Sequence, residues 1–375
     1  MHNTTKNDNN DITLGKDAVI SSDFLTIISS VIDLWLCLSV ALVGVCANVV
    51  TAIVFVRMGF KDTVNITMTF VTFWDLIRTL CGVLHRCYGP VSLISPLDGV
   101  SWQNITLTNI VYLQLIASNI AYVVSAYASL ERGVCVSAPF AVKGVFTPRL
   151  TIAVCSCLSC AVFATQFPIM LVSEHTWVTS PQPGKLVAIY QFTSFYKSYG
   201  QSFIAFFRYI NMAYSVVSLA IMMVSTMVIS HQLKKSSIFR SSACAGKQSN
   251  STPVMSTKEG QVVKMLILVI ATYMLVLVPR VAHYAAQVWE PGYYSMRQYD
   301  NIFWTVVYII SLLDFINSSV SLFIFYSMST NFRKTCQKMF PLCYSVPPGD
   351  QTSQAKYQHE TALSKQTKSL NSISN

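Results

Sequence analysis

The chain has 375 residues, of which 53% are hydrophobic and only 11% are charged, and its mean hydropathy is +0.48. Soluble globular domains carry about 25% charged residues, so most of this protein's surface cannot face water. The composition therefore excludes a soluble enzyme and indicates an integral membrane protein. The net charge of +10 would suit nucleic-acid binding, but its distribution along the chain gives a different explanation.

Seven apolar segments predict seven membrane-spanning helices. The first, residues 34–56, contains no Asp, Glu, Lys or Arg and is long enough to cross about 30 Å of hydrocarbon. The other six cover residues 64–86, 104–134, 150–173, 203–232, 262–287 and 301–327. The polar N-terminal residues lack the apolar core of a cleavable signal peptide, so we expect the first span to direct insertion.

Basic residues between the spans set the orientation by the positive-inside rule. If the N-terminus is outside, Lys and Arg on the cytoplasmic side greatly outnumber the acids there, which are Asp62, Glu131 and Glu259. Acids outnumber bases on the outer side. The basic excess is therefore a topology signal, and no nucleic acid is needed to explain it.

The chain divides into a bundle with two tails. We expect an extracellular tail at 1–29, a seven-transmembrane domain with a short eighth helix at 30–340, and a disordered cytoplasmic tail, rich in Ser, Thr and Gln, at 341–375. The amphipathic stretch Asn331–Phe340 predicts the eighth helix, lying in the membrane interface. The fold class is an all-α membrane protein with a seven-transmembrane helix bundle.

Short motifs predict covalent modification and argue against metal binding. The sequons at Asn3 and Asn104 face outward and could carry glycans. Cys336 and Cys343 are candidates for palmitoylation. Most of the eleven cysteines lie in apolar runs as small buried hydrophobes. Their spacing is not that of metal ligands, so we expect no metal site.

Several motifs arrive in the order and spacing typical of one receptor class. They are Gly44–Val50 as GxxxN, Phe73–Leu76, Glu131–Gly133 as D/E-R-Y, Tyr273–Pro279, Asn317–Tyr326 as N-S-x-x-N-P-x-x-Y, and Phe332–Arg333. Over residues 30–340 the chain thereby resembles the rhodopsin-like (class A) G-protein-coupled receptors. Each motif is weak alone, and their combination is specific.

Departures from this class indicate a divergent branch. Leu107 stands where a disulfide cysteine belongs, and no cysteine follows between Cys160 and Cys244, so that disulfide is absent. Leu277 replaces the switch tryptophan, and Ser321-Leu322 replaces Asn-Pro. Span five has no proline and span four no tryptophan. The pattern resembles the molluscan chemosensory receptors most, followed by invertebrate FMRFamide-type peptide receptors.

The resemblance implies a receptor and not an enzyme. Its expected partners are an extracellular ligand, a heterotrimeric G protein, membrane lipid, and arrestin and a receptor kinase acting on the tail. The expected location is the plasma membrane, with several membrane passes. We expect a chemosensory receptor for small waterborne molecules, with a neuropeptide receptor as the alternative. A transporter or channel is a third interpretation, disfavoured because a carrier has no need of Glu131, Arg132 and Glu259 at its helix ends.

A sodium site is implied around Asp75. A charge in hydrocarbon costs at least about 2.5 kcal/mol, so Asp75 in the middle of span two needs a partner. In the class, this carboxylate binds Na⁺ with polar groups of other spans, and four such residues are available. These are Asn48, Asn317, Ser318 and Ser321. A hydrogen-bonded structural aspartate is the alternative, because Ala121 stands where the class has serine.

An ion pair is expected to close the cytoplasmic side. Arg132 ends span three beside Glu131, and Glu259 stands at the foot of span six. We expect an Arg132–Glu259 pair to hold the two feet together, with Phe325 and Tyr326 in the switch motif of span seven. The alternative is that Arg132 and Glu259 are ordinary interfacial residues whose charged ends extend toward water.

Charged residues in the outer half predict the ligand site. Arg78 and Asp314 lie at depths that would let them form a structural pair. Arg280 follows the proline of span six, and our hypothesis is that it binds an anionic group of the ligand, with a purely structural role as the alternative. The rest of the expected ligand cavity is Gln114, Ser118 and Tyr122, at helical spacing, with Tyr308 opposite.

Two absences exclude neighbouring functions. Span seven has no lysine, so no retinal Schiff base can form there. Span three has no aspartate, so the usual anchor for an amine ligand is missing.

Overall fold

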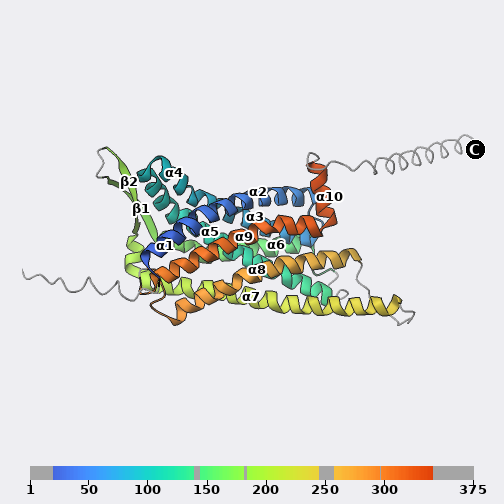
Figure 1. Ribbon diagram of the computed structural model, residues 1–375. Coiled ribbons are helices and arrows are strands. Elements are labelled where there is room, and N and C mark those ends of the chain that lie inside the picture. The colour runs from blue at the N-terminus through green and yellow to red at the C-terminus, as the bar shows by residue number, and fades with distance from the viewer. Residues whose placement is uncertain (1–19, 139–143, 181–183, 245–256, 296, 341–375) are drawn as a thin grey trace, which may run out of the picture. The chain divides into compact units, whose positions relative to one another are not determined.

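The protein is described here from a computed structural model covering residues 20–138, 144–180, 184–244, 257–295 and 297–340. Residues up to Phe332 belong to one compact unit and those from Arg333 onward to a second. Among its described residues, the first unit holds seven helices with the length and apolar composition to cross a membrane (Figure 1). This confirms the predicted number of spans.

The first span is one continuous helical stretch with a change of winding inside it. It consists of α1 (Ser22–Ile28), a π-helical segment η1 (Ser29–Leu36) and α2 (Cys37–Met58). The side chain of Ser21 caps its start by accepting a hydrogen bond from the backbone N–H of Phe24. Gly59, with φ of 84°, ends it, because that backbone angle suits glycine.

Local signals place the ends of the next helices. Asp62 caps α3 by accepting from the Val64 N–H, and proline occupies the first turn of both α5 and α6. The elements are α3 (Thr63–Arg86), α4 (Tyr88–Ile94), α5 (Pro96–Ser137), α6 (Pro148–Gln166) and the 3₁₀ segment η2 (Phe167–Leu171).

A β-hairpin follows the fourth span. Strand β1 (Ser173–Thr179) pairs antiparallel with β2 (Leu186–Phe192), and Ser173 faces Phe192 in the register. The sequence analysis predicted no strand between the fourth and fifth spans, so this hairpin was not expected. Strand β2 packs on α5, where Ser101 Oγ accepts from the Ala188 N–H at 3.2 Å.

The last elements complete the bundle. They are α7 (Ser194–Cys244), α8 (Thr257–Trp289), α9 (Asp300–Met328) and α10 (Thr330–Met339). Helix α8 contains Pro279, which removes one backbone hydrogen bond immediately before Arg280. Helix α10 coincides with the predicted eighth helix, and its place in the membrane interface stays a prediction.

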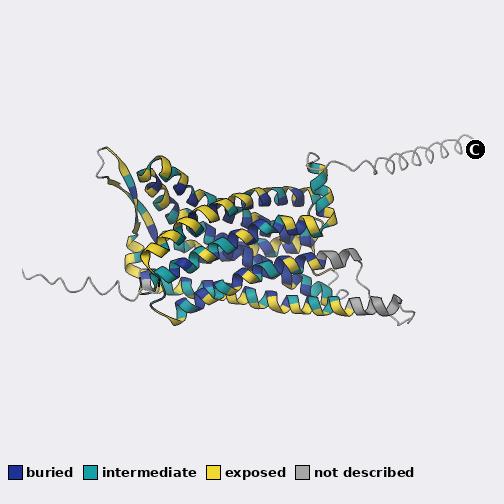
Figure 2. Ribbon diagram, in the orientation of Figure 1, coloured by how far each residue is buried: buried dark blue, intermediate teal, exposed yellow. Residues whose placement is uncertain are grey.

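Helix α5 lies at the centre of the bundle, because it packs against α3, α6, α7 and α8. Helices α7, α8, α9, α2 and α3 follow one another around it as packed neighbours. Buried residues line the inward sides of the helices, and exposed residues lie on their outward sides (Figure 2). Large exposed side chains such as Leu275, Phe323 and Met227 are apolar, as a lipid-facing surface requires.

Candidate functional site

Two buried aspartates, Asp75 of α3 and Asp314 of α9, organise the polar interior of the bundle. Their residues are 1% and 2% exposed. An ionised carboxylate in such surroundings must be paired and hydrogen-bonded to persist. Each of the two receives one arginine and one tyrosine hydroxyl, as described next.

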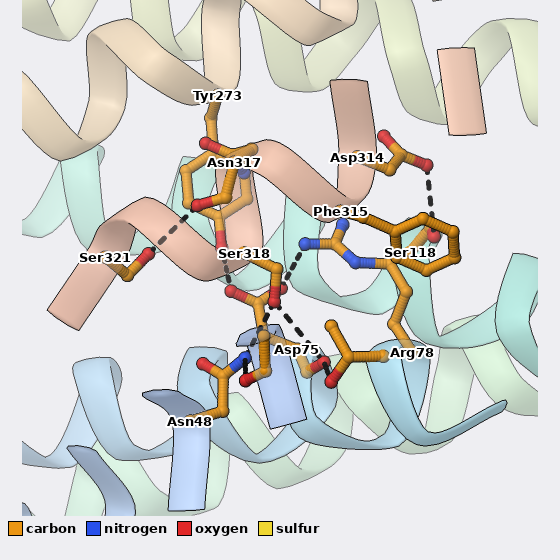
Figure 3. A network of polar contacts seen from close by, with 12 residues as sticks. Asn48, Asp75, Arg78, Ser118, Tyr273, Asp314, Phe315, Asn317, Ser318 and Ser321 are labelled. Carbon is orange, nitrogen blue, oxygen red and sulfur yellow. Dashed lines mark hydrogen bonds and ion pairs between the residues drawn. The ribbon is translucent and has the colours of Figure 1, made fainter. Parts of the chain in front are cut away.

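Asp75 is held from its own helix and from α8. The Arg78 Nη2 donates to its Oδ1 at 2.6 Å, and the Tyr273 hydroxyl donates to its Oδ2 at 2.7 Å (Figure 3). Both carboxylate oxygens therefore accept hydrogen bonds, and the guanidinium neutralises the charge.

Asp314 joins three helices. Its Oδ1 accepts from the Tyr122 hydroxyl of α5, and its Oδ2 pairs with the Arg280 guanidinium of α8. Ser118 Oγ lies 3.5 Å from the same Oδ2. The Arg280 guanidinium also stands 5.2 Å from the centre of the Tyr122 ring, where a cation is attracted to the aromatic face.

The two aspartate centres touch through their tyrosines. The rings of Tyr122 and Tyr273 meet edge to face, with centroids 5.8 Å apart at 90°. The contact links Asp75 of α3 to Asp314 of α9 through α5 and α8. Four helices thus share one buried polar network, and a movement of any of them disturbs the hydrogen bonds of the others.

The predicted Arg78–Asp314 pair is wrong, because Arg78 pairs with Asp75 and Asp314 pairs with Arg280. Asp75 and Arg78 lie three residues apart on one helix, where side chains are neighbours. Their pairing needs no other helix to be in place. Arg280 does hold a carboxylate, as its chemistry suggested, but that carboxylate belongs to the protein.

Four of the residues expected around sodium cluster near Asp75. Asn48 Nδ2 donates to Ser318 Oγ at 2.8 Å and to the Gly44 carbonyl at 2.9 Å. The remaining two, Asn317 and Ser321, are buried on the same helix, and no partner of the Asn317 side-chain amide appears among the described residues. Sodium at this place stays a prediction, which the Arg78 guanidinium makes less favourable.

The residues expected in the ligand cavity divide into two groups. Ser118 and Tyr122 face Asp314, and Gln114, one turn further out on α5, has a buried Oε1 without a partner in the described structure. Tyr308 lies elsewhere. Its ring stacks on Trp304 at 6.0 Å, and its charged neighbours include Asp33, Arg86 and Asp300.

At the opposite end of α5, Arg132 connects two helices. Its Nη2 donates to Glu131 Oε1 at 2.6 Å and to Thr63 Oγ1 at the start of α3. Glu259 belongs to α8, but its side chain lies outside the described residues, so the Arg132–Glu259 pair stays a prediction.

Beside this end, Phe325 is buried and packs with two other phenylalanines. Its ring lies 5.1 Å from Phe55 and 5.7 Å from Phe332. Tyr326, by contrast, is 40% exposed and points away from the interior. Of the two residues expected in the switch motif, Phe325 is thus the one placed between helices.

The expected modification sites differ in their surroundings. Asn104 lies inside α5, is half-buried, and donates from Nδ2 to the Ala188 carbonyl at 2.9 Å, an arrangement that disfavours a glycan on that nitrogen. Cys336 is half-buried in α10. Asn3 and Cys343 lie outside the described residues.

Sequence reasoning missed three partners in the bundle. Asp33 of η1 holds Arg86 of α3, Tyr273 holds Asp75, and Arg208 of α7 lies beneath Tyr294 with its Cζ 5.4 Å from the ring centre. Asp33 and Arg208 carried an available signal, because a charge inside an apolar span always needs a reason.

Seven apolar spans around a charge-paired interior define a multi-pass membrane protein with the architecture of a seven-transmembrane receptor. The family model described as "Serpentine type 7TM GPCR chemoreceptor Srw" matches residues 31–343. The chain therefore belongs to the Srw family of serpentine 7TM GPCR chemoreceptors, a receptor class and not an enzyme class. No curated protein matches the chain.

Proposed function

We propose that this chemoreceptor lies in the plasma membrane with its N-terminus outside, binds a small extracellular ligand and activates a heterotrimeric G protein. The observation that carries the proposal is Asp314, whose carboxylate holds Tyr122 of α5 and Arg280 of α8 to α9. A single group thereby couples the three helices between which a ligand from the outer side would bind.

Ligand binding would act by shifting a pre-existing equilibrium. A displacement of α8 relative to α9 strains the Arg280–Asp314 pair, and the tyrosine contact passes the displacement to Tyr273 and Asp75. A ligand shifts the population of two states only by its difference in affinity for them. Moving the ratio of the two populations from 1:99 to 99:1 takes a difference of about 5.5 kcal/mol between the ligand's binding free energies for the two states.

The cytoplasmic end would carry the response to the G protein. Arg132 ties the end of α5 to the start of α3, and Glu259 stands on α8. We expect the ends of α3, α5 and α8 to separate when these contacts break, and this separation to open the surface on which the G protein docks. The 341–375 segment would serve arrestin and a receptor kinase.

Nucleotide exchange on purified G-protein heterotrimers, measured with membranes containing the receptor, tests the proposal. We expect exchange above that of receptor-free membranes, loss of it in Arg132→Gln, and a raised basal rate in Glu259→Gln. Arg149→Gln, which changes an exposed arginine at the start of α6, is the matched control. No exchange across a panel of heterotrimers, or equal exchange in Arg132→Gln and the wild type at equal surface expression, would reject G-protein coupling.

A ligand screen separates the chemosensory role from the peptide-receptor alternative. Its two arms are small water-soluble acids, amines and amino acids, and amidated FMRFamide-like peptides. A response confined to the small molecules supports chemosensation. A response confined to the peptides assigns the receptor to neuropeptide signalling and overturns this part of the proposal.

A further inference from the structure

Five arginines within the described membrane spans are buried or half-buried, whereas Arg57 and Arg149, near span ends, are exposed. Four of them make an ion pair with an aspartate or glutamate. The pairs are Arg78–Asp75, Arg86–Asp33, Arg132–Glu131 and Arg280–Asp314. Each partner cancels a charge that would otherwise be costly to place in hydrocarbon.

Arg208 departs from this pattern. It lies in the fifth span, six residues from the span's start at Ser202, which puts it about 9 Å inward along the helix. It is half-buried, and its Nε, like those of Arg78, Arg132 and Arg280, is buried without a hydrogen-bond partner in the described structure. No acidic side chain of the described residues makes an ion pair with it. The group that it does face is the Tyr294 ring, 5.4 Å away.

The position of Arg208 is fixed by the residues around it. Asn211, less than one turn further along α7, accepts hydrogen bonds from Asn119 at 2.8 Å and from Gln166 at 3.1 Å. These bonds hold α7 to α5 and α6 in one register. Arg208 consequently stays directed at Tyr294, in the connection between α8 and α9.

The Tyr294 ring that faces this guanidinium lies among other aromatic residues. Tyr294 packs on Phe303 with centroids 5.4 Å apart, and Tyr190 and Tyr196 are among its polar neighbours. Burial raises the pKa of Tyr294, with the Arg208 charge acting in the opposite direction, so its hydroxyl stays protonated and can donate a hydrogen bond. The cluster offers a cation, a hydroxyl donor and flat apolar surface.

We propose that Arg208 and Tyr294 form an anion-binding subsite that receives an aromatic carboxylate as the ligand of this receptor. The carboxylate would accept hydrogen bonds from the guanidinium, as the acids do from Nη2 of the four paired arginines, and the aromatic part would pack on the rings. That this subsite serves the ligand of a receptor rests on the proposed function. Binding itself can be measured without any G protein.

A lipid headgroup offers a second source of the same chemistry, because its phosphate also accepts from a guanidinium. A snorkelling arginine reaches headgroups at the ends of a span. Arg208 faces Tyr294 in a connection between helices, so we assign it to a free carboxylate and make the lipid an arm of the test.

Thermal melting of the purified full-length receptor in phosphatidylcholine nanodiscs tests the subsite, with benzoate as the probe and benzamide as its neutral counterpart. A ligand that binds only the folded state raises the melting temperature in a concentration-dependent way. We expect benzoate to do so and benzamide not to. In Arg208→Gln the apparent Kd for benzoate should rise by about 10- to 100-fold, as expected for loss of a charged hydrogen bond.

Two variants guard against a folding defect. Arg208→Lys keeps the charge and should retain a weaker benzoate effect, because lysine lacks the planar fork. Arg297→Gln removes an exposed arginine of the same connection and should bind benzoate like the wild type. Without benzoate, Arg208→Gln should melt at most slightly lower than the wild type, because it loses its contact with the Tyr294 ring and no ion pair.

Three results overturn the inference. One is an equal benzoate effect in Arg208→Gln and the wild type. Another is no effect of benzoate on the wild type. The third is stabilisation by phosphatidylglycerol, in place of phosphatidylcholine, that depends on Arg208 while benzoate does nothing, which would assign Arg208 to a lipid headgroup. Benzoate binding without nucleotide exchange would leave the subsite standing and reject G-protein coupling.

Discussion

The middle of the bundle and its outer end treat arginine differently. In the middle, Arg78 and Arg280 are almost fully buried, and each is paired with an aspartate that also accepts from a tyrosine. Near the N-terminal end of the fifth span, Arg208 faces an aromatic ring and pairs with no acid among the described residues. In the first arrangement the charges cancel within the protein. In the second, the charge of the arginine is left for the anion that we propose as the ligand.

The difference separates structural charges from a charge available for binding. Removing one member of a buried ion pair leaves the other charge without a partner and lowers stability by about 3–5 kcal/mol. Removing a cation that has no ion-pair partner leaves no such charge behind. Substitutions at the two places should therefore change stability by very different amounts.

Asp314→Asn should have the largest effect. It leaves the Arg280 charge buried without a counterion and weakens the bond from Tyr122, so we expect about 3–5 kcal/mol of lost stability. Melting of the purified receptor, with surface expression in cells, measures the loss. In the double variant Asp314→Asn, Arg280→Gln both charges are gone, and more than half of the stability should return. A double variant no more stable than the single one would contradict the pairing.

Tyr273→Phe tests the second aspartate. It removes the hydroxyl that donates to Asp75 Oδ2 at 2.7 Å and keeps the ring that packs on Tyr122. Hydrogen bonds to charged groups contribute about 1.5–3 kcal/mol, and a loss in that range is expected on melting. Tyr326→Phe, at an exposed tyrosine of α9, should melt like the wild type. Equal melting of Tyr273→Phe and Tyr326→Phe would remove Tyr273 from the network.

Gly82→Ala tests the close approach of α3 to α9. A Cβ at Gly82 would lie 2.3 Å from Phe315 Cζ, so Phe315 must shift, at a cost of about 1–3 kcal/mol. Gly133→Ala is the control, because its Cβ would meet Ser225 at an ordinary 3.5 Å and alanine favours helix. We expect Gly82→Ala to melt lower and Gly133→Ala to melt no lower than the wild type; the reverse order would show that α3 and α9 do not pack as described.

Sodium should have the smallest effect on the wild type. Arg78 already supplies the positive charge next to Asp75, so replacing about 0.15 M sodium, the physiological ionic strength, by choline should leave the melting temperature unchanged. Arg78→Gln frees the carboxylate and should make melting depend on sodium. Sodium dependence in the wild type that is lost in Arg78→Gln would contradict this account and favour the implied sodium site.

The sequence was sufficient for the spans but not for all of their ends. Residues 64–86 were predicted, and α3 covers Thr63–Arg86. The agreement is close because the Asp62 cap marks the start of the helix and the end of the apolar run marks its end. Helix α5 begins at Pro96, earlier than the predicted 104, because a helix can continue beyond its apolar stretch. The hairpin was missed although strand-forming runs flank the sequence Pro-Gln-Pro-Gly at 181–184, whose residue types favour turns.

The sequence predicted which residues belong to the candidate site better than it predicted which of them pair with each other. Asp75, Arg78, Arg280 and Asp314 were recognised because charges in apolar spans are rare. The Arg78–Asp75 pair was also within reach, since three residues separate them on one helix. Arg280 and Asp314 are 34 residues apart in the chain, and only the packing of α8 on α9 brings them together.

The most direct test compares two matched substitutions in one melting experiment. Arg280→Gln and Arg208→Gln each remove one guanidinium from a membrane span, and both receptors are purified and melted without added ligand beside the wild type. We predict a large drop in melting temperature for Arg280→Gln, which leaves Asp314 without its ion pair, and at most a small drop for Arg208→Gln, which loses only its contact with the Tyr294 ring. Equal drops, or a larger drop for Arg208→Gln, would contradict the division between a charge-balanced interior and an outer cation available to a ligand.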